Sequence, residues 1–404
     1  MSAASSVPPR AASGATAELE RLTTVGYAEA AASRGRLASL ALEARNAAVA
    51  ARDAGASAAS PARPFASVEE YLADLARRTV CVTLLAGSGS RWVRSLEAAR
   101  ARGDHRAAAF DASRPRGLFP VEDFLGGTGA RGAAAGSDVA ASQGSAPACP
   151  AGSGGGRVAI AAYALAAFRG LGRHLVVVRG WEAEIDAEAL GPAGIAPGGR
   201  DFFTQAAPFG KPLGHGDAVY QCRGLWAQAD YVLTNFGGDA SSRLTAIESL
   251  LVLDALNAAA RPARGRVDLL MPAAPIVGAA YPIVLDADGL PRSLGHAKLQ
   301  AREVGKGSGL TNVGVRAYRA PALLEKVLSF RERFWEEGRG YSIPGNDPDG
   351  REFALDNVDA ELSTESRARL LAAARPEELT PAKSFDDLPA FERAIETVVA
   401  EDRG

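Results

Sequence analysis

The stretch Thr79-Val-Cys-Val-Thr-Leu-Leu-Ala-Gly-Ser-Gly-Ser-Arg-Trp92 decides the fold, because a strand pattern runs directly into a glycine-rich turn. Residues 79–85 form a continuous apolar and β-branched run, which is typical of a strand buried on both faces of a parallel sheet. The turn after it lets backbone N–H groups point toward a ligand. Because α/β folds bind ligands at the carboxyl ends of parallel strands, this stretch predicts an α/β fold with a binding loop.

Helical and extended patterns alternate beyond this stretch. We expect helices over 160–170, 217–229 and 243–259, and strands over 174–178, 231–235, 267–271 and 280–285. Strands separated by helices imply right-handed crossovers, and therefore a mostly parallel central sheet with helices on both faces. The predicted fold is thus a three-layer, Rossmann-like α/β fold.

The chain divides into segments of different composition. Residues 1–66 are rich in Ala, Leu, Glu and Arg, and we expect an N-terminal helical extension with two helices between positions 15 and 53. A capping-box pattern at Ser67 starts the next helix, and 67–393 is predicted to be one domain. Within it, 126–156 is mostly Gly, Ala and Ser, which predicts a flexible insertion. Residues 394–404 are expected to form a C-terminal tail.

Composition limits the class of partner. A chain of 404 residues with 47% hydrophobic and 23% charged positions can bury a substantial core. The formal net charge of -2 argues against nucleic acid, which would call for a basic stripe. We therefore expect small-molecule partners. Oligomeric state is not indicated.

The cysteines and the hydropathy pattern bear on location. Cys81, Cys149 and Cys222 are far apart, fit no paired metal spacing and leave an odd thiol, as expected in a reducing compartment. No run approaches the roughly 20 apolar residues that a membrane-spanning helix needs, so we expect no membrane span. The expected location is the cytoplasm.

Better-known glycine fingerprints do not fit the turn after residue 85. It lacks the glycine spacing of G-x-G-x-x-G and the Gly-Lys-Ser/Thr of a P-loop. Taken alone, a plain Gly/Ser turn with a surface arginine is about as plausible as a phosphate site.

The turn, however, resembles a third phosphate-binding motif. Ala86-Gly-Ser-Gly-Ser-Arg91 is similar to the A-G-x-G-[ST]-R signature of the sugar-phosphate nucleotidyltransferase family, which has a GT-A-like Rossmann fold. Among its members, the chain resembles UDP-N-acetylglucosamine and UDP-sugar pyrophosphorylases. In this family the loop wraps the triphosphate, which implies a catalytic role for Arg91. The nucleotide-binding residues implied by the resemblance are Leu85, Ala86, Gly87, Ser88, Gly89 and Ser90.

Two later segments extend the resemblance around the nucleotide. Arg114-Pro-Arg-Gly-Leu-Phe-Pro-Val121 matches a family segment with Pro-Lys, and Arg116 stands at the lysine position, where it keeps the positive charge. Pro212-Leu-Gly-His-Gly-Asp-Ala218 resembles P-L-G-T-x-x-A, which implies that Gly214 and His215 contact the base. For His215, the alternative is a capping or surface histidine.

Two acidic segments are implied to hold Mg²⁺. The strand pattern 231–235 leads into Phe-Gly-Gly-Asp239, similar to the family's Gly-Asp, whose carboxylate binds the metal. An aspartate at the end of a central strand would reach the same crevice as the glycine loop, although it could instead cap the next helix near Ser242. Residues 384–392 resemble F-x-D-[IV]-x-T-P-E-[DE] with one residue missing. Asp386 or Asp387 would then complete the site, the alternative being a helix cap.

The acceptor is implied to bind in the latter half. Leu310-Thr-Asn-Val-Gly-Val-Arg-Ala-Tyr318 resembles the family's N-x-G-[IV], which implies that Asn312 and Gly314 contact the sugar. Lys298 is either a partner of the acceptor phosphate or a solvated surface lysine. Residues 352–358 resemble a family helix start and are interpreted as scaffold.

Together these motifs imply a Mg²⁺-dependent nucleotidyltransferase. The phosphate of a sugar 1-phosphate would attack the α-phosphorus of a nucleoside triphosphate in line, and pyrophosphate would leave. One alternative is a glycosyltransferase that uses a nucleotide sugar, although the strand ends in Gly-Gly-Asp-Ala-Ser241 without a D-x-D pair. The other is a non-catalytic nucleotide-binding module.

Overall fold

The computed structural model describes residues 14–24, 26–53, 64–86, 89–125, 156–259, 265–276, 282–294, 308–344 and 351–403. The predicted insertion lies outside these residues, apart from Gly156. In the part of the chain that the structure describes, every helix is too short or too polar to cross a bilayer.

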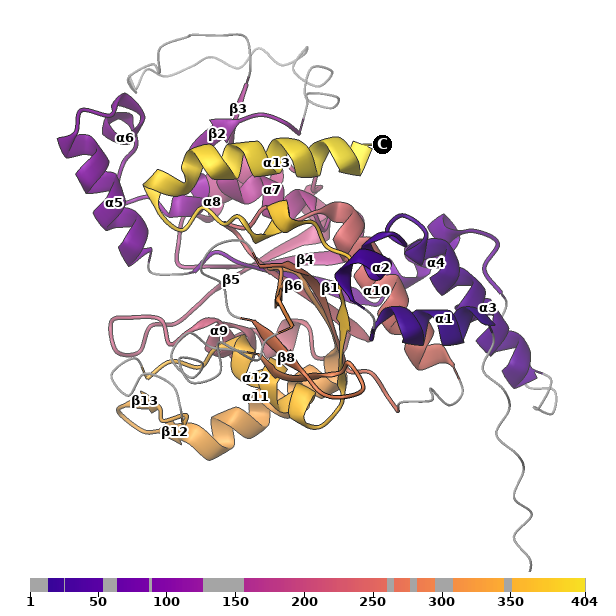
Figure 1. Ribbon diagram of the computed structural model, residues 1–404. Coiled ribbons are helices and arrows are strands. Elements are labelled where there is room, and N and C mark those ends of the chain that lie inside the picture. The colour runs from indigo at the N-terminus through magenta and orange to yellow at the C-terminus, as the bar shows by residue number, and fades with distance from the viewer. Residues whose placement is uncertain are drawn as a thin grey trace, which may run out of the picture.

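An eight-stranded central sheet organises the molecule (Figure 1). Its strands run in the order β10-β7-β11-β6-β1-β4-β5, with β14 also paired to β7. β5, β4, β1 and β6 are parallel neighbours, β14 is parallel to β7, and β11 runs antiparallel between β6 and β7. The bounds are β1 Thr79–Leu84, β4 Arg173–Val178, β5 Arg200–Thr204, β6 Tyr231–Phe236, β7 Leu269–Pro275, β10 Leu310–Asn312, β11 Arg316–Arg319 and β14 Ala368–Leu371. The predicted α/β fold with a mostly parallel sheet is confirmed.

Helices cover both faces of this sheet. Figure 1 shows α7 and α13 above it and α9, α11 and α12 below it. Alternate residues of β4 face opposite ways: Leu175 belongs to one apolar cluster and Val176 to the other, as period-2 side chains in a central strand must. The bounds are α5 Ser90–Ala101, α7 Ile160–Ala166, α9 His215–Gln221, α10 Arg243–Ala258, α11 Ala320–Phe334, α12 Leu355–Thr364 and α13 Leu388–Arg403.

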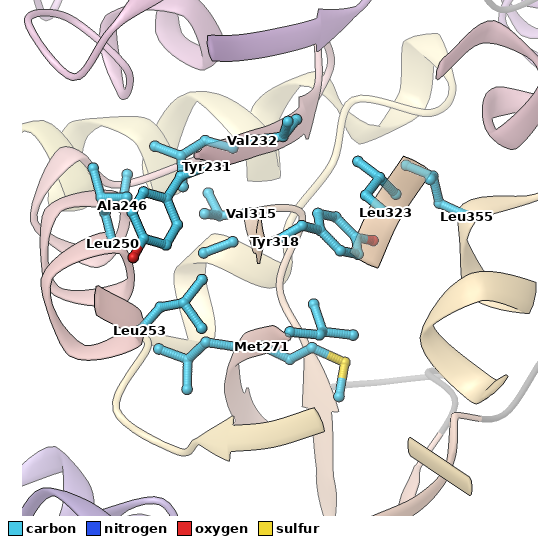
Figure 2. Close-up of a cluster of buried hydrophobic side chains, with 14 of the residues drawn as sticks. Tyr231, Val232, Ala246, Leu250, Leu253, Met271, Val315, Tyr318, Leu323 and Leu355 are labelled. Carbon is cyan, nitrogen blue, oxygen red and sulfur yellow. The ribbon is translucent and has the colours of Figure 1, made fainter. Parts of the chain in front are cut away.

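A large apolar cluster packs between the central sheet and the helices beside it. Figure 2 shows side chains of α10 meeting those of β6 and β11, with α11 and α12 closing the other face. Its labelled members are Tyr231, Val232, Ala246, Leu250, Leu253, Met271, Val315, Tyr318, Leu323 and Leu355. This packing fixes the positions of β6 and β11, whose ends carry site residues.

The described residues of the N-terminal extension form three helices where two were expected: α1 Gly14–Leu22, α2 Tyr27–Ala31 and α3 Leu37–Asp53. α3 lies against α10. In the turn between α2 and α3, the Arg34 guanidinium bonds both carboxylate oxygens of Glu401 at 2.8 and 2.9 Å. The extension is therefore tied directly to the last helix of the chain.

Some predicted boundaries are wrong. Residues 394–403 are not a tail: they form the second half of α13 and bury Ile395 and Val398, an amphipathic pattern that the domain division overlooked. The predicted helix 217–229 is the shorter α9, followed by a 3-10 turn at Arg223–Leu225.

The predicted strand 280–285 is the short β8, Ile283–Leu285, and it pairs with β9, Pro291–Leu294, outside the central sheet; residues 280 and 281 lie outside the described part. The remaining elements are α4 Val68–Ala76, α6 His105–Ala109, α8 Glu182–Ile185, β2 Pro120–Glu122, β3 Arg157–Ala159, β12 Trp335–Glu336 and β13 Gly340–Tyr341.

Candidate active site

A cleft of about 430 Å³ opens at the carboxyl ends of β1 and β6. β1 pairs with β4 on one side and with β6 on the other, so the strand order reverses here. Crevices at such reversal points are the usual ligand sites of open α/β sheets. Segments far apart in the sequence meet at its walls, including Leu84–Ala86, Gly89–Trp92, Pro115–Gly117, Phe236, Glu352 and Lys383.

The predicted binding loop borders this cleft. Leu85, Ala86, Gly89 and Ser90 line it; Gly87 and Ser88 lie outside the described residues. α5 begins at Ser90, and its N-cap is Gly89, which adopts the left-handed conformation with φ 62°. Because a glycine cap has no side chain to accept from the first turn, the N–H groups there are available to an anion or to water.

Arg116 also lines the cleft, in the 3-10 helix Arg116–Leu118. A Cβ atom built on Gly238 would come within 2.7 Å of its guanidinium, so the glycine permits this approach. Burial lowers the pKa of Arg116, as does the positive charge of Arg91, while Asp239 and Asp387 oppose the shift. Among the described residues, no carboxylate oxygen lies within 4 Å of the Arg116 guanidinium, so Arg116 makes no ion pair with them.

Asp239 follows β6 through Gly237 and Gly238 and lies against Gly314, outside the residues that line the cleft. Burial raises the pKa of Asp239 to about 6, although Lys383, Arg116 and Arg316 favour its charged form. The alternative role as a helix cap is not observed, because α10 is capped by Ser242, whose Oγ accepts from the N–H of Thr245. The carboxylate is therefore available for another role.

The two other predicted metal ligands separate clearly. The negative charge of Asp387 favours the charged form of Arg116. The Asp387 carboxylate also accepts the N–H of Ser384 at 2.6 Å, so Asp387 caps its own turn. Asp386 is exposed and bonds Arg102 at 2.8 Å. The charges of Asp387 and Asp239 thus each act on Arg116, whereas Asp386 is bound at the end of α5.

The donor set suits only one kind of metal site. The described residues contain no group of three or more Asp, Glu, His or Cys side chains that could enclose a metal ion. Mg²⁺ is commonly bound by one or two carboxylates together with substrate phosphates and water. A magnesium ion that enters with a phosphorylated ligand would fit the carboxylate of Asp239, whereas the described residues form no permanent protein cage.

His215 and Gly214 lie in the cleft wall and also hold the scaffold together. The Nδ1 atom of His215 accepts the N–H of Leu355 at 2.9 Å, which caps the start of α12. The His215 ring meets Phe236 edge-to-face at 4.9 Å between centroids. Gly214 has φ 93°, and a Cβ atom there would lie 2.4 Å from the carbonyl oxygen of Phe353. The capping alternative for His215 is thus correct, and it coexists with a place in the cleft.

The residues predicted to bind the acceptor differ in where they lie. Asn312 ends β10, and Gly314 lies against Asp239: a Cβ atom on Gly314 would be 1.9 Å from Asp239 Oδ2. Gly314 therefore makes room for the carboxylate. Lys298 lies outside the described residues.

Two cationic residues near the site were not predicted. Lys383 is exposed, lines the cleft and favours ionised Asp239; its position one residue before the motif at Ser384 was the available signal. Arg316 is 3% exposed and bonds Asp356 and Asp359, each at 2.6 Å, while its guanidinium lies 5.4 Å from the ring centroid of Phe236. A charged residue in an apolar strand beside the predicted Gly314 was the signal for Arg316.

Comparison with known proteins adds no relative. No protein-family model matches this sequence, and no curated protein resembles it at a significant level.

Proposed function

We propose that the cleft transfers a nucleotidyl group from a nucleoside triphosphate to a sugar 1-phosphate, with magnesium and with release of pyrophosphate. The observation that carries the proposal is the convergence of four distant segments on one crevice. The glycine loop with Arg91, the Arg116 turn, the end of β6 at Phe236 and Lys383 line the crevice, and the charges of Asp239 and Asp387 act on Arg116.

The charge pattern supports a polyphosphate ligand. Arg91, Arg116 and Lys383 line the cleft, and the first two make no ion pair within the described part of the chain. Against these three cations the cleft lining has one carboxylate, Glu352, and a triphosphate would neutralise the excess of positive charge at the lining. Arginine also offers paired N–H donors to phosphate oxygens.

The part of the cleft around Phe236 and His215 suits a nucleoside. Its walls are the Phe236 ring, the His215 ring and Ala218, with the amide of Gln205 beside them. Aromatic and apolar surfaces with a few polar groups are typical of small-molecule pockets. The nucleotide would therefore lie with its base near His215 and its phosphates across the glycine loop.

In this proposal the chain contributes position and electrostatics. Arg91 and Arg116 hold the phosphates and stabilise the negative charge that grows on the leaving pyrophosphate. Asp239 and Asp387 would hold the magnesium ion, which when bound supplies Lewis-acid polarisation of phosphate oxygens. Asn312 and Gly314, near Asp239, would border the acceptor. No covalent enzyme intermediate is needed.

We also propose a family and a cellular location for the chain. The motifs and the crevice favour a GT-A-like member of the sugar-phosphate nucleotidyltransferases, divergent at Arg116 and His215. A reducing location such as the cytoplasm agrees with the buried free thiols of Cys81 and Cys222.

Pyrophosphate release tests the reaction. UTP, CTP, GTP, ATP and dTTP are each incubated with magnesium and a panel of sugar 1-phosphates and phosphocholine. The expected result is release that requires one triphosphate and one acceptor together. Nucleotide binding without release from any pair would contradict a transferase, and hydrolysis or transfer from a nucleotide sugar would indicate the glycosyltransferase instead.

A further inference from the structure

A second cavity adjoins the cleft on the other side of the glycine loop. It has a volume of about 180 Å³ and opens between the ends of β1 and β4. Leu85, Gly89, Trp92 and Arg116 line both cavities, so they share a wall. Its volume is below the roughly 300 Å³ at which drug-sized ligand pockets begin, which favours a fragment-sized group.

Arg179 supplies this cavity with a free cation. It follows β4 directly, is exposed, and lines the cavity. Within the described residues it makes no hydrogen bond or ion pair through its guanidinium. Arg114, which also lines the cavity, is already held by both carboxylate oxygens of Glu188, at 2.6 and 2.7 Å. Arg116 and Arg179 are therefore the cations that remain for an anion.

The backbone next to Arg179 is unusual. Gly180 has φ 97° and Trp181 has φ 69°, a conformation that a bulky residue rarely adopts. Such strain persists only where the surroundings impose it, and it concentrates at ligand sites. Both residues line the cavity, so the strained turn shapes its rim.

Trp92 supports the shared wall from inside the protein. Its side chain is 1% exposed and packs against the rings of Phe110, Phe119 and Phe385. The α5 N-terminus at Gly89 adds uncapped backbone N–H groups to the same wall.

We propose that this second cavity is a diphosphate subsite, in which Arg179 and Arg116 bind either free pyrophosphate or the β- and γ-phosphates of a triphosphate. The proposal rests on the proposed function, because that reaction produces pyrophosphate. The α-phosphate would then lie at the shared wall, between the acceptor side of the cleft and the leaving group. Arg179 is a binding residue for the group that departs.

Calorimetric titration with sodium pyrophosphate and magnesium tests the subsite without any turnover. Arg179→Ala is expected to weaken pyrophosphate binding about tenfold or more, as the loss of a charge-assisted contact should. Binding of AMP, CMP, GMP or UMP should remain as in the unmodified protein, because a monophosphate does not reach the subsite. Arg157→Ala is the matched control, since Arg157 is equally exposed and lines neither cavity.

The outcomes separate this inference from the proposed reaction. Arg179-dependent pyrophosphate binding in a protein that shows no transfer would support the subsite while contradicting the transferase. Equal affinity in Arg179→Ala and Arg157→Ala, or no pyrophosphate binding at all, would overturn the subsite. Titration with α,β-methylene triphosphates distinguishes the two sources, because weakened binding there assigns the subsite to the substrate as well as to the product.

Discussion

Two arginines, one in the N-terminal extension and one in the cleft, differ in how they are used. Arg34, in the turn between α2 and α3, bonds Glu401, Ser242 and Thr245 and lies 3.5 Å from Glu378. Arg116, in the cleft, makes no ion pair within the described residues, and burial lowers its pKa. Arg34 is fully satisfied by the protein itself, whereas Arg116 is left for a ligand.

The difference has an energetic meaning. A buried charge without partners is unfavourable and persists only where another requirement maintains it. Around Arg34 the network joins the N-terminal extension to α13 and contributes to stability. Around Arg116 the same residue type remains uncompensated, and a polyphosphate would supply the compensation. Mutations in the two regions should therefore affect different quantities.

The largest effect is expected at Asp239. Asp239→Asn keeps the shape of the side chain but removes the charge that would hold magnesium, so turnover should fall about 1,000-fold. The melting temperature should stay the same or rise, because a buried charge is lost. Turnover and melting temperature are measured on the same preparation. Retained turnover at saturating magnesium would exclude Asp239 as the ligand.

The same assay separates the two neighbouring acids. Asp387→Asn should lower turnover, whereas Asp386→Asn should leave it unchanged, because Asp386 is bound to Arg102 at the surface. The reverse pattern would show that the 3-10 turn at these residues is oriented differently in the working protein.

The next effect is on stability. Arg34→Ala leaves the buried Glu378 without its cation, leaves Glu401 with Arg375 alone, and should lower the free energy of unfolding by about 3 kcal/mol. Turnover per folded molecule should not change. Urea unfolding measures the loss, with Arg77→Ala, which removes an exposed ion pair to Asp74, as a control that should cost under about 1 kcal/mol.

A smaller effect on turnover is expected at Gly314. In Gly314→Ala the methyl group would displace the Asp239 carboxylate, and misplacement of about 1 Å at a reacting centre can cost about 100-fold. Gly198→Ala is the control, because a Cβ atom there meets nothing within 4 Å. Full activity in Gly314→Ala would mean that the position of Asp239 is not critical.

The smallest effect is a pH dependence of stability that arises from Glu248 in α10. Burial raises the pKa of Glu248 to about 7, from an ordinary value of 4.5. Between these values the folded protein binds more protons than the unfolded chain, so this group's contribution to stability falls as pH rises from about 4.5 to 7. Glu248→Gln should remove that loss and gain about 2 kcal/mol relative to the unmodified protein between pH 5 and 8. Parallel stability curves for the two proteins would contradict it.

Local patterns predicted much of the fold. The apolar run before the glycine turn became β1, and the runs ending at Val178 and before Gly237 became β4 and β6. Each is buried on both faces, so composition alone identifies it. β5 was missed because it lies at the sheet edge and its residues are only partly buried, which weakens the apolar signal.

Site residues were predictable where a sequence motif contained them. They were not predictable where the site depends on contacts between segments that are distant in the sequence. The loop at Gly89, Arg116 and Asp239 were expected to converge: Gly89 and Arg116 line the same cleft, and the charge of Asp239 acts on Arg116 without Asp239 lining that cleft. Arg179 has no local signature, because an arginine in a loop is usually a solvated surface residue, and the only signal for Lys383 was its place next to the motif at Ser384. Their significance arises only from the cavities that the fold brings to them.

The most direct test measures the thermal shift produced by a nucleoside triphosphate with magnesium in two variants. Arg116→Ala should melt close to the unmodified protein without ligand and lose most of the ligand-induced shift. Arg34→Ala should melt several degrees lower and keep the shift. A full shift in Arg116→Ala, or loss of the shift in Arg34→Ala, would contradict the claim that the cleft arginine is reserved for phosphate.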